Sequence, residues 1–250
     1  MQPRAPKPRK AWAGTPAEQE CAAQGPGRGL SKAQRCARDG RDSTRNGNNR
    51  KTLIPNPNIT AVILAGGRAR RMAGHDKGLI PLAGRPMIEH VIDALRPQVG
   101  ELLISANRNL DDYRRYEFPV IADTLNDFQG PLAGVAAALE ACPTEYLLTV
   151  PCDAPLIPAD LAATLYSALA KADAAVVHDG ERTQAGFALL RRSLLPNLLG
   201  YLAGGGRGLH HWYATLNPAL ADYAGRAGCF HNLNTPEDLA AFKTQASPAC

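Results

Sequence analysis

A glycine pair followed by basic residues is the first stretch of this chain that could do chemistry. Gly66 and Gly67 come directly after the apolar run 61–64, and Arg71 and Lys77 follow within about ten residues. A glycine-rich turn after a strand lets backbone N–H groups approach phosphate oxygens, because no Cβ stands in the way. Arginine and lysine supply the positive charge that a bound triphosphate needs. The stretch therefore predicts a nucleotide phosphate site, and its alternative is a surface turn with solvated arginines.

Asp153 is the second residue with a clear chemical use, because it follows another apolar run in the sequence P-C-D-A-P. Mg²⁺ takes one or two protein carboxylates and fills its octahedron with phosphates and water. The competing interpretation is that Asp153 caps the helix expected from Pro158, although five residues is a long distance for a cap. We expect Asp153 to ligate Mg²⁺ while Lys77 neutralises charge on the α-phosphoryl group.

The elements that would position these residues alternate between apolar strands and helices. Strands are expected at 61–64, 101–105, 119–122, 146–150 and 174–178, with a further, antiparallel candidate at 186–190. Helices are expected at 86–95, 111–116, 132–141, 158–171, 194–202, 209–216 and 235–243. This alternation predicts an α/β fold of three layers with a mostly parallel central sheet.

The polar candidates stand at the carboxyl ends of these strands. Gly66 follows the first strand, Ser105 ends the second, Asp123 follows the third and Asp153 follows the fourth. Ligands of open parallel sheets bind outside the carboxyl ends of the strands. Asp123 could accept the paired N–H groups of guanine or bind a ribose hydroxyl, and the sequence does not choose between them.

Charge and composition divide the chain. Residues 1–58 hold 12 of the 28 Lys and Arg residues but only 4 of the 23 acidic residues. With few large apolar side chains, they are expected to be a disordered basic extension. They could bind nucleic acid weakly or resemble a transit peptide, but we favour no role and expect no specific nucleic-acid partner. The catalytic domain is expected at 59–245 and a short tail at 246–250.

Several classes of protein are disfavoured by what the sequence lacks. No apolar run approaches the roughly 18 residues that cross a bilayer, and no apolar signal-peptide core is found near the start, so we expect a cytoplasmic protein. The six cysteines show no zinc-finger spacing. No G-x-G-x-x-G follows the first strand, which disfavours an NAD-type dehydrogenase.

The pattern LAGG-x-A-x-R-M-x-G-x-D-K-G-L resembles that of the molybdenum cofactor guanylyltransferases, within the nucleotidyltransferase superfamily, and this resemblance implies a Rossmann-like nucleotidyltransferase fold. The matching positions are Leu64, Ala65, Gly66, Gly67, Arg71, Met72, Gly74, Asp76, Lys77 and Gly78. The likeness extends over roughly residues 59–243 and does not cover the first 58.

The resemblance implies an activity and a set of site residues. GMP would pass from GTP to the terminal phosphate of molybdenum-molybdopterin, releasing pyrophosphate and forming molybdopterin guanine dinucleotide, with Mg²⁺ as cofactor. The implied catalytic residues are Lys77, Arg71 and Asp153, and the implied nucleotide-binding residues are Leu64, Ala65, Gly66, Gly67, Lys77, Ser105, Asn107, Asp123 and Asp153. Transient contact with molybdenum insertion proteins or acceptor apoenzymes is also expected.

Two positions refine this resemblance. Relatives with LAGG tend to use GTP and relatives with LAAG tend to use CTP, so Gly67 favours the larger purine. The family often has an asparagine where Ser105 stands, and Asn107 is then the next polar candidate.

The end of the chain carries F-x-N-x-N-T-P-E-D-L, which also looks like the family. Asn232 and Asn234 would share one side of an extended segment and could face the pterin or the metal-phosphate region. The competing interpretation is that Asn234 or Thr235 caps the last helix, and both can hold. Arg182 and Arg207 are candidates for the phosphate of the second substrate, although solvated arginines are an equal alternative.

Three other functions remain as alternatives. One is a nucleotidyltransferase of the same fold that uses CTP on molybdopterin or an NTP on a sugar phosphate. Another is a non-catalytic nucleotide-sensing module, against which Lys77 and Asp153 argue. The third is a nucleic-acid-binding protein that relies on its basic leader.

Overall fold

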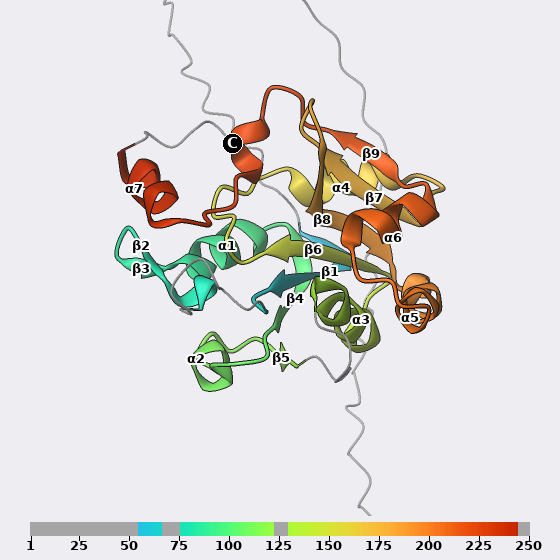
Figure 1. Cartoon of the computed structure of the whole chain (residues 1–250), viewed down its shortest axis with the longest axis horizontal. Helices are drawn as coiled ribbons and strands as arrows, with labels where there is room; N and C mark the ends of the chain where they lie inside the picture. The colour runs from blue at the N-terminus through green and yellow to red at the C-terminus, as the bar shows by residue number, and fades with distance from the viewer. Residues whose placement is uncertain (1–54, 67–75, 123–129, 245–250) are drawn as a thin grey trace, which may run out of the picture. The chain divides into compact units, whose positions relative to one another are not determined.

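A seven-stranded sheet in the order β5-β4-β1-β6-β8-β7-β9 forms the centre of the molecule (Figure 1). The structure is a computed structural model that describes residues 55–66, 76–122 and 130–244. The strands are β1 (Asn56–Leu64), β4 (Val99–Ser105), β5 (Val120–Ile121), β6 (Tyr146–Pro151), β7 (Ala174–His178), β8 (Thr183–Arg191) and β9 (Ala219–Asp222). Every pairing is parallel except those of β8, which runs antiparallel to β6 and β7. The expected mostly parallel sheet and its antiparallel strand are confirmed.

Helices cover both faces of this sheet. They are α1 (Met87–Leu95), α2 (Leu110–Arg114), α3 (Pro131–Ala141), α4 (Leu161–Leu169), α5 (Leu195–Ala203), α6 (Leu209–Leu216) and α7 (Pro236–Thr244). Short 3-10 helices are η2 (Lys77–Leu79), η3 (Arg192–Leu194) and η4 (Ala227–Phe230). Helices α1 and α4 pack on one face, while α3, α5 and α6 pack on the other. The three-layer expectation is confirmed.

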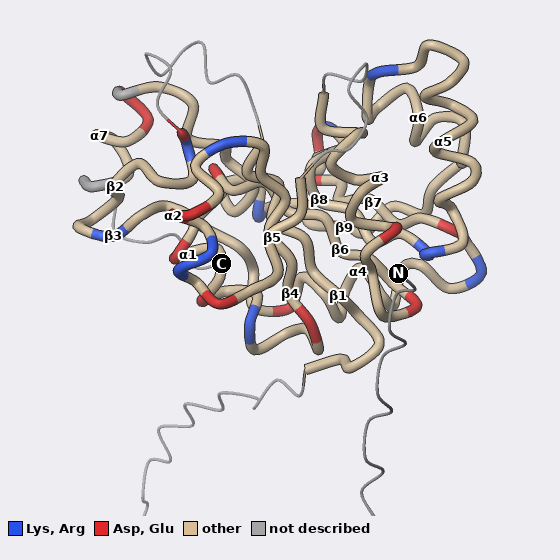
Figure 2. The backbone as a smooth tube through the Cα atoms, turned by 90° about the horizontal axis from the view of Figure 1, so that it is seen from below, with Lys and Arg blue, Asp and Glu red and all other residues tan. Residues whose placement is uncertain are grey.

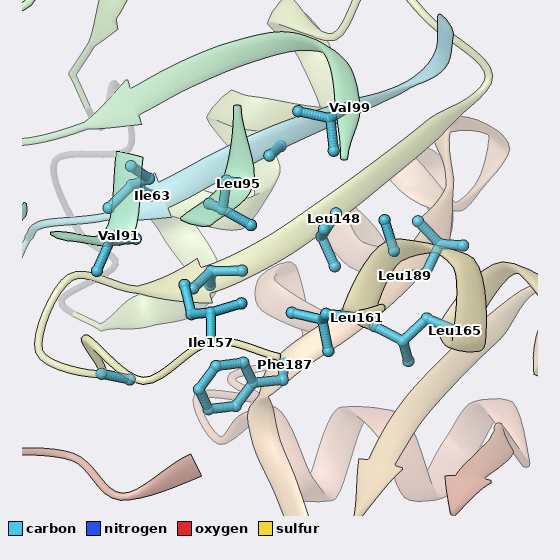
Figure 3. Close-up of a cluster of buried hydrophobic side chains, with 14 of the residues drawn as sticks. Ile63, Val91, Leu95, Val99, Leu148, Ile157, Leu161, Leu165, Phe187 and Leu189 are labelled. Carbon is cyan, nitrogen blue, oxygen red and sulfur yellow. The ribbon is translucent and has the colours of Figure 1, made fainter. Parts of the chain in front are cut away.

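The alternation of side chains along β1 explains why both faces need helices. Ile59, Ala61 and Ile63 point into the core beneath α1 and α4, whereas Val62 points into the core beneath α3. Side chains of a strand alternate between its two faces, so a strand that is apolar at both sets of positions must be covered twice. Figure 3 shows Ile63 in the first core with side chains from α1 and α4. Charged residues are absent from β1 and β6, in the middle of the sheet (Figure 2).

The last helix packs over a small hairpin at the edge of the molecule. The hairpin pairs β2 (Pro81–Leu82) with β3 (Arg85–Pro86). A third apolar cluster joins it to α7 through Leu82, Met87, Leu233, Leu239 and Phe242. In Figures 1 and 2, α7 lies beside β2 and β3, across the molecule from α5 and α6. This cluster fixes the chain just before α7, which bears on the site described below.

Several boundaries differ from the sequence-based expectation. Helix α4 begins at Leu161, with Asp160 at its N-cap, instead of at Pro158. The interpretation that Asp153 caps this helix is therefore wrong. Strand β9 and the β2–β3 hairpin were not anticipated, because they are short and β9 mixes apolar and polar residues with Leu220 55% exposed. Among the described residues, no helix is long and apolar enough to cross a membrane.

The double coverage of the sheet predicts a large cost for truncating a central side chain. Leu148 on β6 is fully buried in the first core (Figure 3). Replacing it with alanine should lower the free energy of unfolding by about 3 kcal/mol, because the cavity cannot fully collapse. Urea titration measures this. Leu199→Ala on α5, where the leucine is 42% exposed, should cost less than about 1 kcal/mol, and equal costs would contradict the assigned core.

Candidate functional site

The carboxyl ends of four parallel strands lie in register at one edge of the sheet. Leu64 of β1 is opposite Ser105 of β4 and Pro151 of β6, and Ser105 is opposite Ile121 of β5. Two backbone hydrogen bonds extend this alignment past the strands. The amide of Ala65 donates to the carbonyl of Ser105 (2.8 Å), and the amide of Cys152, immediately before Asp153, donates to the carbonyl of Leu64 (3.2 Å). The residues that directly follow β1, β4 and β6 are thereby brought together.

Lys77 is the centre of a contact between three distant parts of the chain. Its Nζ donates a hydrogen bond to Oδ2 of Asp153 at 2.8 Å and another to Oδ1 of Asn234. The side chains of Lys77 and Asp153 are 24% and 11% exposed, so the ion pair is partly buried and still open to solvent on one side. The three sequence candidates therefore form one cluster.

The segment that carries Asn234 is held from both directions. The backbone amide of Leu233 donates to the carbonyl of Asp153 at 2.8 Å. On the other side, Asp238 N–H donates to Thr235 Oγ1 (3.1 Å), while the Asp238 carboxylate accepts from the amides of Asn234 (2.8 Å) and Thr235 (2.9 Å). This reciprocal arrangement is a capping box at the start of α7. Thr235 therefore caps α7, as one interpretation of the motif expected, and Asn234 accepts a hydrogen bond from Lys77.

A second anchor lies just upstream of this segment. The guanidinium of Arg226 donates to both carboxylate oxygens of Asp160, at 2.9 and 3.1 Å, and lies 5.0 Å from the centroid of the Tyr223 ring. Burial alone would raise the pKa of Asp160, but the hydrogen bonds and charge of Arg226 lower it overall. The pair joins the start of α4 to the chain that leads into Asn232 and Asn234.

The other nucleotide candidates in the described residues line the same edge. Gly66 and Asn107 are exposed neighbours, because a Cβ added to Gly66 would lie 3.7 Å from Nδ2 of Asn107. Ser105 is 4% exposed, and its Oγ would lie only 2.8 Å from a Cβ at Gly134 of α3. Gly134 therefore lets the helix approach the strand end closely. Gly67, Arg71 and Asp123 lie outside the described residues.

Arg182 and Arg207 occupy two other loops. Arg182 lies in the turn between β7 and β8, where its Nε is 4.0 Å from Oδ2 of Asp179. Burial would raise the pKa of Asp179, but hydrogen bonds from the amide of Arg182, the side chain of Gln184 and a further amide lower it to about 2. Arg207 donates to the backbone carbonyls of Leu202 and Gly206 in the loop between α5 and α6.

The donor set at Asp153 fits a magnesium ion that is shared with a substrate. Among residues 55–66, 76–122 and 130–244, no group of three or more His, Cys, Asp and Glu side chains could hold a metal by itself. A cation at Asp153 would thus depend on one or two carboxylates with phosphates and water, which is the coordination Mg²⁺ prefers. Oδ1 of Asn232, an oxygen acceptor, is buried and has no hydrogen-bond partner in the part of the chain that the structure describes.

From the sequence, Asp76 was identified only as one position of the motif, and no structural role was predicted for it. Its buried carboxylate lies next to Lys77 in the chain and accepts a hydrogen bond from Tyr113 on α2. The only sequence signal was the D-K-G motif itself, because nothing in the pattern of α2 ties Tyr113 to a residue 37 positions earlier.

Comparison of the chain with known proteins identifies its family. Residues 61–219 match the model of the MobA-like NTP transferase domain. The molybdenum cofactor guanylyltransferase of Yersinia pseudotuberculosis (strain IP 31758) is 47% identical over 182 residues, covering 73% of this chain and 93% of the relative. That of Shewanella sediminis is 48% identical over 181 residues, covering 72% and 92%.

Solved structures give the same relationship. The molybdopterin-guanine dinucleotide biosynthesis protein A of Archaeoglobus fulgidus superposes with a TM-score of 0.62 at 25% identity, covering 74% of this chain and 96% of that one. The 4-diphosphocytidyl-2C-methyl-D-erythritol synthase of Anaerococcus prevotii reaches 0.60 at 15% identity, covering 74% and 94%, and supports the fold alone.

The capping box predicts that Thr235 stabilises the segment carrying Asn234. Thr235→Ala removes the side-chain acceptor for the Asp238 amide, which costs about 1 kcal/mol. Hydrogen exchange of the α7 amides should then be about fivefold faster, while β1 amides are unchanged. Ser167→Ala on α4, which removes only an exposed hydroxyl bonded to the Ala163 carbonyl, is the control. Unchanged protection of α7 would contradict the cap.

Proposed function

The chain belongs to the MobA-like NTP transferase family, and we propose that it transfers GMP from GTP to the terminal phosphate of molybdenum-molybdopterin, forming molybdopterin guanine dinucleotide. The observation that carries this proposal is the contact of Lys77 with Asp153 and Asn234 at the carboxyl edge of the sheet. It assembles a cation, a carboxylate and an amide where open α/β sheets bind their ligands. The 47% identity to a guanylyltransferase supports the choice of substrates.

The reaction needs alignment and charge neutralisation more than proton transfer. An oxygen of the pterin phosphate attacks the α-phosphorus of GTP, the bond from that phosphorus to the bridging oxygen breaks, and pyrophosphate leaves with the electron pair. Because the attacking phosphate is already an anion, no general base is required. Catalysis of this kind comes from holding the two phosphates in line and stabilising the developing charge.

Each catalytic residue has a role in this scheme. Lys77, with Arg71 from the preceding loop, would bind oxygens of the triphosphate, where a fixed cation offsets charge in the transition state. Asp153 would hold Mg²⁺, which neutralises phosphate charge when it is bound. The ion pair between Lys77 and Asp153 keeps both groups at the site before the substrate arrives.

The remaining candidates divide between the two substrates. Gly66 and Gly67 would offer backbone N–H groups to GTP, while Leu64 and Ala65, whose amide already donates to Ser105, would position that turn against the nucleotide. Ser105, Asn107 and Asp123 would lie along the nucleoside. Asn232 and Asn234 are proposed for the pterin and its phosphate, together with Arg182 in the β7–β8 turn and Arg207 in the α5–α6 loop. We further propose that the enzyme acts in the cytoplasm, with transient contacts to molybdenum insertion proteins or acceptor apoenzymes.

The domain boundaries also belong to this proposal. The expected division is a basic extension of 1–58, a catalytic domain of 59–245 and a tail of 246–250, but residues 56–58 lie in β1, so we place the start of the catalytic domain at Asn56. Strand β1 begins at Asn56, whose amide donates to the carbonyl of Gln98 at 3.1 Å. A truncated protein should therefore begin before residue 55 to keep β1 whole, and it should retain the transferase activity.

Removing either charge of the central pair should abolish most of the activity. Lys77→Met and Asp153→Asn each keep the approximate size of the side chain but remove its charge. Loss of one such electrostatic interaction costs about 3 kcal/mol or more in barrier, so kcat should fall more than about 100-fold. Release of pyrophosphate from GTP, with Mg²⁺ and loaded pterin present, measures this.

Matched variants separate catalysis from a general effect of charge. Lys171→Met and Asp173→Asn change exposed residues beyond α4, at the opposite end of β7 from the site, and should leave kcat within about twofold. Melting temperatures check that all four variants are folded. Near-normal turnover by either Lys77→Met or Asp153→Asn would refute the proposed site.

The family resemblance predicts which base the site accepts. Aligned on Leu64 and Ala65, LAAG has its alanine at position 66, so the expectation placed on Gly67 is one residue off and the informative variant is Gly66→Ala. It adds the methyl group of the relatives that use CTP, so kcat/KM for GTP should fall by at least about tenfold while that for CTP does not. Gly200→Ala on α5, where an added Cβ meets nothing within 4 Å, is the matched control. Equal use of CTP and GTP by the unaltered protein would favour the alternative cytidylyltransferase.

A further inference from the structure

Asp76 is a buried carboxylate that the proposed chemistry does not use. Its side chain is 3% exposed, although it stands immediately before Lys77. Oδ1 accepts from the hydroxyl of Tyr113 (2.5 Å) and from the amide of Gly78 (3.3 Å). Oδ2 accepts from Nδ2 of Asn109 (3.1 Å) and lies 3.7 Å from Nε of Arg108. Burying a carboxylate costs free energy of folding unless it is paired and hydrogen-bonded. The donors around Asp76 offset this cost, and the question is what the protein gains from burying a carboxylate at this position.

These hydrogen bonds join two parts of the proposed site. The amide of Gly78 belongs to η2, the single turn that begins at Lys77. Arg108, Asn109 and Tyr113 belong to the segment that leaves the end of β4 just after Asn107. Asp76 thus connects the turn that carries the phosphate-binding lysine to the loop that carries a nucleoside candidate.

The fit between Gly78 and Tyr113 shows how tightly this connection is packed. A Cβ added to Gly78 would lie 2.6 Å from the Tyr113 hydroxyl oxygen, whereas the nearest ring carbons would be 3.4 Å away. Tyr113 is fully buried and is the one buried residue of α2. Burial, and then its hydrogen bond to Asp76, raise the pKa of Tyr113, so the hydroxyl is a donor at neutral pH.

We propose that Asp76 is a positioning residue that, with Tyr113, fixes η2 so that the Lys77 ammonium reaches Asp153 and the substrate phosphate. This inference rests on the proposed function, because it gives Asp76 no contact with substrate and lets it act only through Lys77. A direct role as a metal ligand is disfavoured, since both Asp76 oxygens already accept hydrogen bonds within the protein.

A double-mutant cycle on the full chain tests the coupling. Asp76→Asn places an N–H₂ group against donors of Asn109 or Tyr113, so the turn should shift and kcat should fall by about 10- to 100-fold. In the Lys77→Met background the same change should lower the residual kcat less than about twofold, because the group it positions is gone. Radiolabelled GTP makes the residual turnover measurable.

The cycle distinguishes failure of this inference from failure of the proposed function. If Lys77→Met alone keeps near-normal activity, the proposed function fails. If Lys77→Met is impaired but Asp76→Asn lowers kcat equally in both backgrounds, Asp76 does not act through Lys77 and the inference is overturned. Where melting shows Asp76→Asn to be unfolded, Tyr113→Phe replaces it in the same cycle with the same expected pattern.

The contact between Gly78 and Tyr113 supplies a second double-mutant cycle. Gly78→Ala alone should lower kcat by at least about tenfold, because the Tyr113 hydroxyl must move. In the Tyr113→Phe background the clashing oxygen is gone and the positioning hydrogen bond is already lost, so Gly78→Ala should lower kcat less than about twofold further. In the background of Tyr146→Phe, a buried tyrosine whose hydroxyl accepts from Arg191 at the far end of β6, Gly78→Ala should keep its full effect. An equal fold loss from Gly78→Ala with and without Tyr113→Phe would overturn the inference.

Discussion

The hydrogen-bonded ion pair between Lys77 and Asp153 is the constraint on which the rest of the structure depends. The two residues are 76 positions apart in the chain, yet their charged atoms lie 2.8 Å apart with most of both side chains covered. A partly buried charge must be paired, since removing its partner leaves a desolvated charge that costs several kcal/mol. The fold therefore has to deliver three loops to one point with little freedom.

The parallel sheet and the end of the chain together meet this requirement. Register between β1 and β6 places the turn containing Asp153 beside Leu64, the last residue of β1. The C-terminal segment then closes the cluster through the Leu233 amide and Asn234. The capping box of α7 and the apolar cluster beneath it keep this segment in place, so structure far from the sheet contributes directly to the site.

Much of this could be predicted from sequence where a local pattern carries the information. Helix α1 follows from apolar residues at helical spacing from Met87 to Leu95, and the pairing of strand ends follows from the parallel sheet. The main site candidates could be predicted because glycines, a lysine and an aspartate that follow strands have specific uses in binding phosphate and metal ions. The sequence could not show the network of Asp76 and Tyr113, or strand β9, because both depend on contacts between segments with no shared local signal.

The central claim is that Lys77 and Asp153 hold one magnesium–triphosphate between them. The most direct measurement is a crystal structure with Mn²⁺ and a GTP analogue that has a non-hydrolysable α–β bond, using the anomalous signal to locate the metal. The account predicts a Mn²⁺ peak about 2.2 Å from a carboxylate oxygen of Asp153 and the Lys77 ammonium within about 3 Å of a phosphate oxygen. A metal and triphosphate bound elsewhere, with the Lys77–Asp153 pair untouched, would contradict it.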